Sequence, residues 1–372
     1  MTLENVHPST EFIPLEHVES RLQQLWAAEG AAGTVRARTR NVVVVLHDRT
    51  LLESTIDLFA SIGHHHPSRI LVLVPNPETP DPGIAADARL VCPTGGTPAF
   101  CCEVILLHAR TDVWHHVPAA VLVCLLPELP VYLWWRRPLD PDDALFRQLQ
   151  PLVDVLLVDT GSSETPERTI TTLGQVCHRF PWGCVDLTWT RLTAWREHVA
   201  QLFDPLDRRP FLKAVERVSM TVAPSPLGTA AALYFSSWLA ERLGWEPRSR
   251  WRPGARSREL RFQANSHPVR LNVNRSHSTE DIPITRIRLH MSGIIPATFT
   301  VALGEDSGQA EVTVEMSNTR LRQVHLMRGA DTRAALHEAL ALNGRDWIFE
   351  RTLHMALRLL SPPSNAHVKG EQ

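Results

Sequence analysis

The chain has 372 residues, of which 44% are hydrophobic and 21% charged, and its formal net charge is -2. Its length predicts two domains, because single hydrophobic cores stop growing at about 250–300 residues. The nearly neutral charge gives no reason to expect binding to nucleic acid or to an anionic membrane surface. The N-terminal residues 1–14 lack a basic stretch followed by an apolar one, so we expect no signal peptide and a cytoplasmic protein.

The first part of the chain alternates helix and strand patterns. A helical stripe over 15–28 precedes a β-branched strand at 42–46, a helix at 51–62 and a second buried strand at 70–74. This β-α-β unit has a short loop, so it predicts a parallel strand pair. Further strands are expected at 89–92, 102–107, 120–126, 131–135 and 153–158, with helices at 111–116, 142–149, 166–178 and 191–203. The alternation predicts an α/β domain over residues 1–207 with a mostly parallel layered sheet.

The apolar stretch 117–135 is nearly long enough to cross a bilayer. Three prolines, Pro118, Pro127 and Pro130, interrupt it, and Glu128 lies inside it. A lipid-facing span must satisfy its backbone groups internally, which such breaks prevent. Two buried strands, 120–126 and 131–135, are therefore predicted in place of a membrane span.

The strand at 131–135 lies between Pro130 and Pro138 and contains Trp134 and Trp135. Neighbouring side chains on a strand point to opposite faces, so one core cannot hold both indoles. Either the strand is central and covered on both faces, or one indole faces a partner or a ligand. Arg136 and Arg137 follow at its C-terminal end, where open α/β sheets bind ligands, and Trp and Arg are enriched at interface hot spots.

The second part of the chain, residues 208–372, has a different texture. A helix is expected at 227–242, and a final pair of helices at about 331–343 and 346–360. Between them, period-two alternation predicts strands at 260–264, 269–273, 285–290, 298–302, 311–315 and 322–327. Several strands followed by terminal helices predict an α+β domain with an antiparallel sheet.

Motifs for nucleotide binding and nucleophilic catalysis are missing. The first strand is followed by His47, Asp48, Arg49 and Thr50, with no glycine to bring backbone amides close to a phosphate. The first domain is thus predicted to be Rossmann-like without the glycine fingerprint, with no cofactor and no catalytic residues. The loop at 160–163, TGSS, is either an anion-binding loop or an ordinary polar loop.

Histidines and cysteines do not form a recognisable metal motif. The histidines at 64–66 and 115–116 are consecutive, a spacing that seldom converges on one ion. None of the six cysteines lies in a Cys-x-x-Cys motif. We expect no metal site and structural cysteines without disulfides, with a redox role as the alternative.

The arginines suggest an anion site or an acidic partner surface. Arg36 and Arg38 alternate before the first strand, and Arg69 precedes the second strand, whereas Arg136 and Arg137 follow a strand. In a parallel sheet these two groups lie at opposite edges. One shared arginine site therefore requires the Trp strand to run antiparallel.

Three segments together resemble the glucose-6-phosphate dehydrogenase assembly protein family, OpcA. They are RARTRNVVVV at 36–45, HPSRIL at 66–71 and ELPVYLWWR at 128–136. In the first domain the resemblance rests on these motifs. In the second domain it rests on the length of the domain and on its pattern of helices and strands. The residues that match, and that we take as candidates for partner binding, are Arg36, Arg38, His66, Pro67, Ser68, Arg69, Trp134, Trp135, Arg136 and Arg137.

The resemblance implies a non-enzymatic partner of glucose-6-phosphate dehydrogenase. Such a protein promotes oligomer assembly and allosteric activation of that enzyme at the start of the oxidative pentose phosphate pathway, in a higher-order hetero-oligomer. In photosynthetic members, cysteines link the protein to thioredoxin control, but the resemblance does not place those cysteines here. The alternative, suggested by the arginines and the loop at 160–163, is a sugar-phosphate- or nucleotide-binding enzyme or sensor. A metal-dependent protein built on the histidines at 64–66 is a third hypothesis.

Overall fold

The computed structural model divides into two compact units. The first unit comprises Met1–Val158 and Cys177–Cys184, and the second comprises Asp159–Val176 and Val185–Gln372. The structure describes residues 12–29, 36–80, 83–92, 100–252, 257–265, 267–276, 282–293, 295–304, 308–317, 319–327 and 329–361. By this division, the chain leaves the first unit earlier than the predicted boundary at residue 207 and returns to it once.

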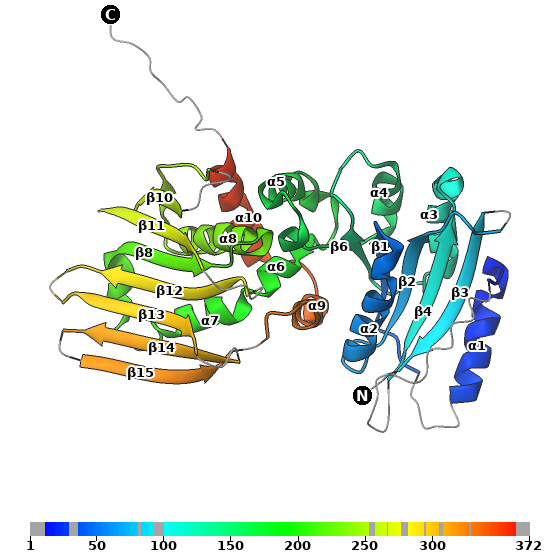
Figure 1. The fold of residues 1–372 in the computed structure, drawn as a ribbon, viewed down its shortest axis with the longest axis horizontal. Coiled ribbons are helices and arrows are strands. Elements are labelled where there is room, and N and C mark those ends of the chain that lie inside the picture. The colour runs from blue at the N-terminus through cyan, green and yellow to red at the C-terminus, as the bar shows by residue number, and fades with distance from the viewer. Residues whose placement is uncertain are drawn as a thin grey trace, which may run out of the picture. The chain divides into compact units, whose positions relative to one another are not determined.

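A seven-stranded sheet forms the centre of the first unit (Figure 1). Its strand order is β3-β4-β2-β1-β5-β6-β7. Parallel pairing joins β4 to β2, β2 to β1, β1 to β5 and β5 to β6, whereas β3 runs antiparallel to β4. The strands are β1 Arg40–Leu46, β2 Ser68–Pro75, β3 Ile84–Val91, β4 Cys102–Ala109, β5 Val131–Arg136, β6 Val155–Val158 and β7 Cys184–Asp186. The predicted α/β class with a mostly parallel sheet is confirmed.

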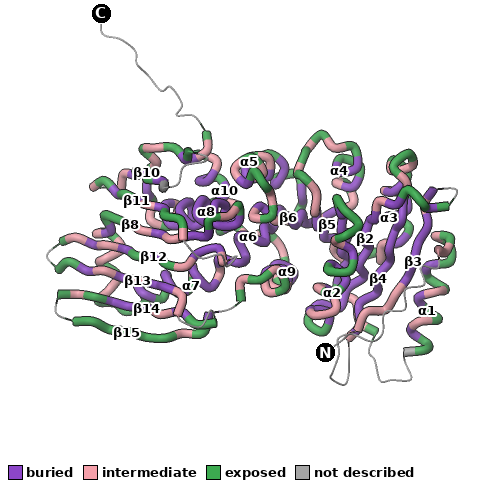
Figure 2. The backbone as a smooth tube through the Cα atoms, viewed as in Figure 1, coloured by how far each residue is buried: buried purple, intermediate pink, exposed green. Residues whose placement is uncertain are grey.

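The inner strands of this sheet are buried on both faces, as Figure 2 shows for β2 and β4. In β1 every residue is buried, which explains why its sequence is an unbroken apolar run and does not alternate. The helices of this unit are α1 Val18–Glu29, α2 Leu52–Ile62, α3 Val117–Cys124 and α4 Ala144–Leu149. Short 3-10 turns precede several of them.

One predicted strand, residues 120–126, is wrong, because that segment belongs to helix α3, Val117–Cys124. Pro118 lies in the first turn of the helix, where its missing N–H costs nothing. A short, wholly apolar run does not distinguish a strand from a helix by periodicity. The segment predicted as a helix at 111–116 is a 3-10 helix that leads into α3. Among the described residues, no helix combines the length and apolar character needed to cross a bilayer.

The second unit contains an eight-stranded sheet of order β15-β14-β13-β12-β8-β11-β10-β9. Its neighbours pair antiparallel except β8 and β11, which are parallel. The strands are β8 Val215–Val222, β9 Glu246–Pro247, β10 Ser257–Gln263, β11 Pro268–Arg275, β12 Ile284–Met291, β13 Ala297–Leu303, β14 Gln309–Met316 and β15 Thr319–Leu326. The sequence patterns missed β8, because a bulge near Glu216 breaks its alternation.

The second unit also contains helices, of which α7 and α8 contact the sheet. Its helices are α5 Pro166–Val176, α6 Leu187–Thr190, α7 Thr193–Gln201, α8 Pro226–Arg242, α9 Thr332–Ala341 and α10 Trp347–Leu360. The central helix α8 contacts β8, β12, α5, α6 and α10, so residues around its whole circumference are buried. Asp331 and Asp346 cap α9 and α10 by accepting backbone N–H groups. The predicted α+β class with an antiparallel sheet and terminal helices is confirmed.

Candidate functional site

The Trp-Trp-Arg segment is strand β5, and both of its indoles are buried. The strand lies between β1 and β6, and the exposed fractions of Trp134 and Trp135 are 1% and 3%. Trp134 packs edge-on against Phe59 of α2, with ring centroids 6.1 Å apart. Trp135 packs in the same way against Phe146 of α4 at 5.1 Å. Of the two alternatives, the central strand covered on both faces is the one observed.

The two arginines after β5 stack on these indoles. The guanidinium of Arg136 lies 4.6 Å from the ring centroid of Trp134, and it donates a hydrogen bond to Thr55 Oγ1. Arg137 lies 5.8 Å from the centroid of Trp135 and 5.4 Å from that of Trp114. Each arginine thus covers the end of one aromatic layer, where cation–π attraction adds to packing.

Three of the other signature residues meet at one buried carboxylate, Glu103 of β4. Arg69 donates through Nε to Glu103 Oε2 at 2.9 Å, and Arg38 forms an ion pair with Oε1. Arg36 Nη2 lies 3.4 Å from the same Oε1. The side chain of Glu103 is fully buried, so its charge depends on these partners. We call Glu103, Arg36, Arg38 and Arg69 the Glu103 cluster.

Further groups complete the Glu103 cluster. Trp26 of α1 donates from Nε1 to Glu103 Oε1 at 2.7 Å. Arg69 also donates to the backbone oxygen of Cys124 at 3.0 Å and pairs with Glu19. Burial raises the pKa of Glu103, but the hydrogen bond from Arg38 and the charge of Arg69 outweigh burial, so the pKa lies below its usual range. The cluster joins α1, β2, β4 and the segment before β1.

Sequence reasoning missed Glu103, although a signal for it was present. It is the one acidic residue in the apolar strand β4, Cys102–Ala109, and an acidic residue inside a buried strand requires cationic partners. The arginines were found, and their division between two edges is confirmed. Because β5 pairs parallel with β1, Arg36, Arg38 and Arg69 lie at the opposite sheet edge from Arg136 and Arg137.

The signature residues His66 and Pro67 lie directly before β2 and Ser68 begins that strand; all three are buried. Ser68 donates from Oγ to the His66 backbone oxygen at 2.8 Å. The Pro67 backbone oxygen accepts from the Thr39 amide at 2.9 Å. These contacts hold the start of β2 against the start of β1, so this segment supports the Glu103 cluster.

The turn after β1 is closed by its own side chain. Asp48 accepts a hydrogen bond from the Thr50 amide at 2.9 Å, ahead of α2. Hydrogen bonds from Thr50 hold the pKa of Asp48 below its usual range. A carboxylate at this position occupies the place where a Rossmann domain binds the phosphates of a dinucleotide, and it repels them.

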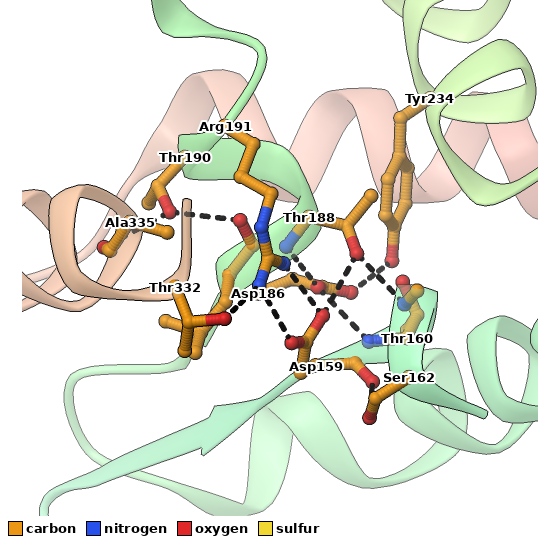
Figure 3. A network of polar contacts seen from close by, with 12 residues as sticks. Asp159, Thr160, Ser162, Asp186, Thr188, Thr190, Arg191, Tyr234, Thr332 and Ala335 are labelled. Carbon is orange, nitrogen blue, oxygen red and sulfur yellow. Dashed lines mark hydrogen bonds and ion pairs between the residues drawn. The ribbon is translucent and has the colours of Figure 1, made fainter. Parts of the chain in front are cut away.

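In the second unit, a polar network surrounds Asp159 and Asp186 (Figure 3). Arg191 forms two parallel hydrogen bonds to Asp159, from Nη1 to Oδ1 at 2.8 Å and from Nη2 to Oδ2 at 2.9 Å. Arg191 Nη2 also donates to Thr332 Oγ1 of α9 at 3.0 Å. Thr188 Oγ1 of α6 donates to Asp159 Oδ1 at 3.1 Å. The carboxylate therefore joins α6 and α9 to the chain after β6.

Asp186 is fully buried at the centre of this network. Its Oδ2 accepts from the Tyr234 hydroxyl at 2.6 Å, and its Oδ1 accepts from the amides of Thr188 at 2.8 Å and Thr160 at 3.2 Å. Burial raises the pKa of Asp186 to about 6, and the charge of Asp159 adds to this effect, while Tyr234 opposes it. Perturbed carboxylates occur in active sites and in structural networks alike. Each oxygen here is occupied by the protein itself, so the arrangement is structural.

The backbone amides of the loop at 160–163 donate hydrogen bonds to acceptors within the chain. The amide of Gly161 donates to Thr188 Oγ1 at 2.7 Å, and those of Ser162 and Ser163 donate to backbone oxygens of Asp159 and Thr160. With the Thr160 amide bound to Asp186, no amide of this loop is left for a phosphate. The polar-loop alternative is therefore the one observed, and the anion-binding alternative is wrong.

The cysteines depart from expectation in one place, because Cys92 and Cys101 form a disulfide. Val91 of β3 pairs with Cys102 of β4, so the residues just beyond them face each other with Cα atoms 4.3 Å apart. The remaining cysteines are buried, and burial raises the pKa of Cys102 and of Cys124 to about 11. Thiols of that pKa are poor nucleophiles and metal ligands. Within the described ranges, no three His, Cys, Asp or Glu side chains gather as metal ligands would.

Comparison with solved structures finds proteins whose backbones align with this one at low sequence identity. A UDP-N-acetylglucosamine 3-dehydrogenase, GnnA, from Acidithiobacillus ferrooxidans aligns with a TM-score of 0.44 and 11% identity, over 87% of this chain and 97% of that chain. An NAD binding oxidoreductase from Klebsiella pneumoniae aligns with a TM-score of 0.48 and 11% identity, over 86% and 95%. Similarity at this level says nothing about activity.

Sequence comparison finds closer relatives. The OpcA protein of Synechocystis sp., named for the OxPP cycle, is 27% identical over 322 residues, which cover 81% of this chain and 65% of the relative. The OpcA protein of Nostoc punctiforme is 31% identical over 189 residues, which cover 50% of this chain and 40% of the relative. The chain thus spans less than two thirds of the length of these relatives.

Family models match both parts of the chain. Residues 60–175 match the model described as the glucose-6-phosphate dehydrogenase subunit N-terminal domain, and residues 182–353 match the corresponding C-terminal domain. Together the two models cover most of the chain, and both carry the family name OpcA. The chain therefore belongs to the OpcA family of glucose-6-phosphate dehydrogenase assembly proteins.

Proposed function

We propose that this protein is a non-catalytic, cytoplasmic partner of glucose-6-phosphate dehydrogenase. It assembles with the enzyme into a higher-order hetero-oligomer and activates it allosterically in the oxidative pentose phosphate pathway. The observation that carries the proposal is the family match, which extends over both parts of the chain. The relatives named for the OxPP cycle support the same pathway.

The interior of the protein supports a binding role over a catalytic one. Asp48 closes the turn after β1, and the amides at 160–163 are bound internally. The buried carboxylates of Glu103 and Asp186 are enclosed by donors from the chain itself. These groups stabilise the fold, so an effect on metabolism is expected to arise through a bound protein.

A reconstitution experiment tests the proposal. Purified protein is mixed with glucose-6-phosphate dehydrogenase from the same organism, and the mass of the mixture is measured by light scattering after gel filtration. The rate is then measured as a function of glucose-6-phosphate. We expect a complex heavier than either component and a rate curve shifted to lower substrate concentration. Separate elution together with an unchanged rate curve would overturn the proposal.

The alternative of a sugar-phosphate- or nucleotide-binding enzyme or sensor has lost the two features that suggested it. The candidate arginines 36, 38, 69, 136 and 137 are bound to Glu103 or stacked on indoles, and the loop at 160–163 has no free amide. Calorimetry with glucose-6-phosphate, NADP⁺ and ATP provides the check, and we expect no heat of binding from this protein alone.

A further inference from the structure

Among the described residues, no helix is found packed on the outward face of the eight-stranded sheet of the second unit. In β12 the buried residues Ile287 and Leu289 alternate with the exposed residues Arg286 and Arg288. Helix α8 contacts β8 and β12 on the buried side. Strand alternation therefore places Arg286 and Arg288 on the opposite, outward side.

Arginines dominate one half of this outward face. We call Arg217, Arg261, Arg270, Arg286 and Arg288, which come from strands β8, β10, β11 and β12, the arginine face; all five residues are exposed. Arg261 pairs in register with Arg270, which in turn pairs with Arg217. Adjacent strands lie about 4.8 Å apart, so three cationic residues stand side by side in one lateral row.

One exposed acid, Glu259 of β10, lies on the same side of the sheet, and the five residues of the arginine face outnumber it. Among the described residues, none of its five side chains forms an ion pair or a hydrogen bond within the chain. The other half of the sheet differs, because Arg322 pairs with Glu311 at 2.8 Å and Arg320 with Glu315 at 3.3 Å. The same arginines affect the pKa of His290. Burial has the largest effect and lowers this pKa, and the charges of Arg288 and Arg217 lower it further.

Such an arrangement works against the stability of the isolated chain. Like charges directly opposite each other on a sheet are destabilising, by an amount within the roughly 0.2–1 kcal/mol range of cross-strand pairs. The neighbouring strands β14 and β15 show that this sheet can place glutamates opposite arginines. The unbalanced row therefore points to a counter-charge that comes from another molecule.

We propose that the arginine face binds a carboxylate-rich surface of a partner protein. This inference rests on the proposed function, under which that partner is glucose-6-phosphate dehydrogenase. Guanidinium groups form paired, parallel hydrogen bonds to carboxylates, and they are more weakly hydrated than ammonium groups, so they suit protein interfaces. Complementary charge also speeds encounter between two proteins.

The residues between the arginines favour a protein over a nucleic acid. The outward positions of β8, β11 and β13 carry the small polar residues Ser219, Thr221, Asn272 and Thr300. Proteins that bind single strands stack bases on exposed aromatic rings. Along these strands the aromatic Phe299 is instead buried on the inner side. A surface of arginines and small polar residues, with the single acid Glu259, matches a folded acidic partner.

The test compares paired variants of the full chain for binding to immobilised dehydrogenase from the same organism. The double variant Arg217→Glu/Arg270→Glu reverses two neighbours of the row. The control Arg168→Glu/Arg333→Glu makes the same change of charge in the first turns of α5 and α9, where glutamate is tolerated well. A third variant, Arg217→Gln/Arg270→Gln, removes the repulsion without reversing charge, and thermal unfolding verifies that each variant is folded.

We expect Arg217→Glu/Arg270→Glu to weaken binding at least about tenfold, mainly through slower association, and the control to change it less than about twofold. We also expect Arg217→Gln/Arg270→Gln to weaken binding while leaving the unfolding temperature equal or higher. Binding of the wild-type protein should weaken as salt rises from about 0.05 to 0.3 M.

Two results would overturn the inference while leaving the proposed function in place. The first is unchanged binding by Arg217→Glu/Arg270→Glu. The second is wild-type binding of single-stranded RNA that is lost in this variant while dehydrogenase binding is kept, which would assign the face to nucleic acid. Failure of the wild-type protein to bind the dehydrogenase at all would overturn both the proposed function and this inference.

Discussion

The hydroxyl of Tyr234 lies 2.6 Å from Oδ2 of Asp186 and donates a hydrogen bond to it. Within the second unit, this contact joins the middle of α8, Pro226–Arg242, to the residue that caps α6, in a fully buried environment. Because burial raises the pKa of Asp186 to about 6, ionisation of this group works against folding.

The first prediction concerns pH. The folded pKa of Asp186 is raised above its unfolded value, so its contribution to stability is full below the unfolded pKa, near 4, and is lost as pH rises through about 6. The loss amounts to roughly 3 kcal/mol at most. Asp186→Asn should therefore flatten the dependence of the free energy of unfolding on pH between about 4 and 7. Urea titrations across that range provide the measurement.

The variant Tyr234→Phe is the matched test of the same contact. It removes a hydrogen bond that favours the charged carboxylate, so the pKa of Asp186 should rise further and the loss of stability should extend to higher pH. An Asp186→Asn protein that keeps the wild-type pH profile would show that another group produces it.

The second prediction concerns Glu103. Replacing it with Gln removes the buried counter-charge of Arg69, which is 1% exposed, and we expect a loss of about 3–5 kcal/mol in unfolding free energy. The control Glu19→Gln removes a half-exposed partner of the same arginine and should cost less than about 1 kcal/mol. Equal effects from the two variants would contradict the central role of Glu103.

Glu103 should also show the opposite pH behaviour from Asp186. Its folded pKa is lowered, so its contribution is present above the unfolded pKa and is lost as pH falls. Wild-type protein should therefore lose stability in acid, and Glu103→Gln should lose less on acidification than wild type does. Circular dichroism during acid titration measures this difference.

The third prediction concerns the two indoles of β5. Trp134→Ala and Trp135→Ala should each cost about 3–5 kcal/mol, because each removes a buried aromatic side chain and leaves a cavity. Trp347→Ala is the control, since that indole is 62% exposed and should change stability by less than about 1 kcal/mol. A fully stable Trp135→Ala protein that fails to bind the dehydrogenase would instead favour a role at the interface.

The fourth prediction concerns close packing at Gly228 in α8. A Cβ atom there would lie 2.1 Å from the backbone oxygen of Ala223. Alanine is otherwise better than glycine in a helix by about 1 kcal/mol, but this clash should outweigh the gain and destabilise the protein by about 1–3 kcal/mol. Gly308→Ala, where a Cβ meets nothing within 4 Å, should be neutral in the same thermal unfolding assay.

The fold could be predicted in large part because its signals are local. Prolines mark the limits of β5, and the β-branched run of β1 marks a strand buried on both faces. Helix α3 could not be separated from a strand, because its short apolar run has no period. Strand β8 was missed because its bulge interrupts the alternation on which the prediction relied.

The candidate residues were found more readily than their partners. The arginines at 36, 38 and 69 stand out in the sequence, but their meeting at Glu103 depends on the lateral order of β1, β2 and β4. Likewise, burial of both indoles required knowing that β6 pairs on the far side of β5. Pairing between strands distant in sequence is set by the tertiary fold, and single-chain patterns do not encode it locally.

The path of the chain between the two units has a consequence for synthesis. The first unit is complete only when residues 177–184 have been made, and the ribosome builds 159–176, which belong to the second unit, before them. Tyr234, which donates to Asp186, and Thr332, which accepts from Arg191, are synthesised later than Asp159 and Asp186. We expect these polar side chains of the nascent chain to stay in water until helices α8 and α9 have been made, so that the second unit reaches its final packing after the first.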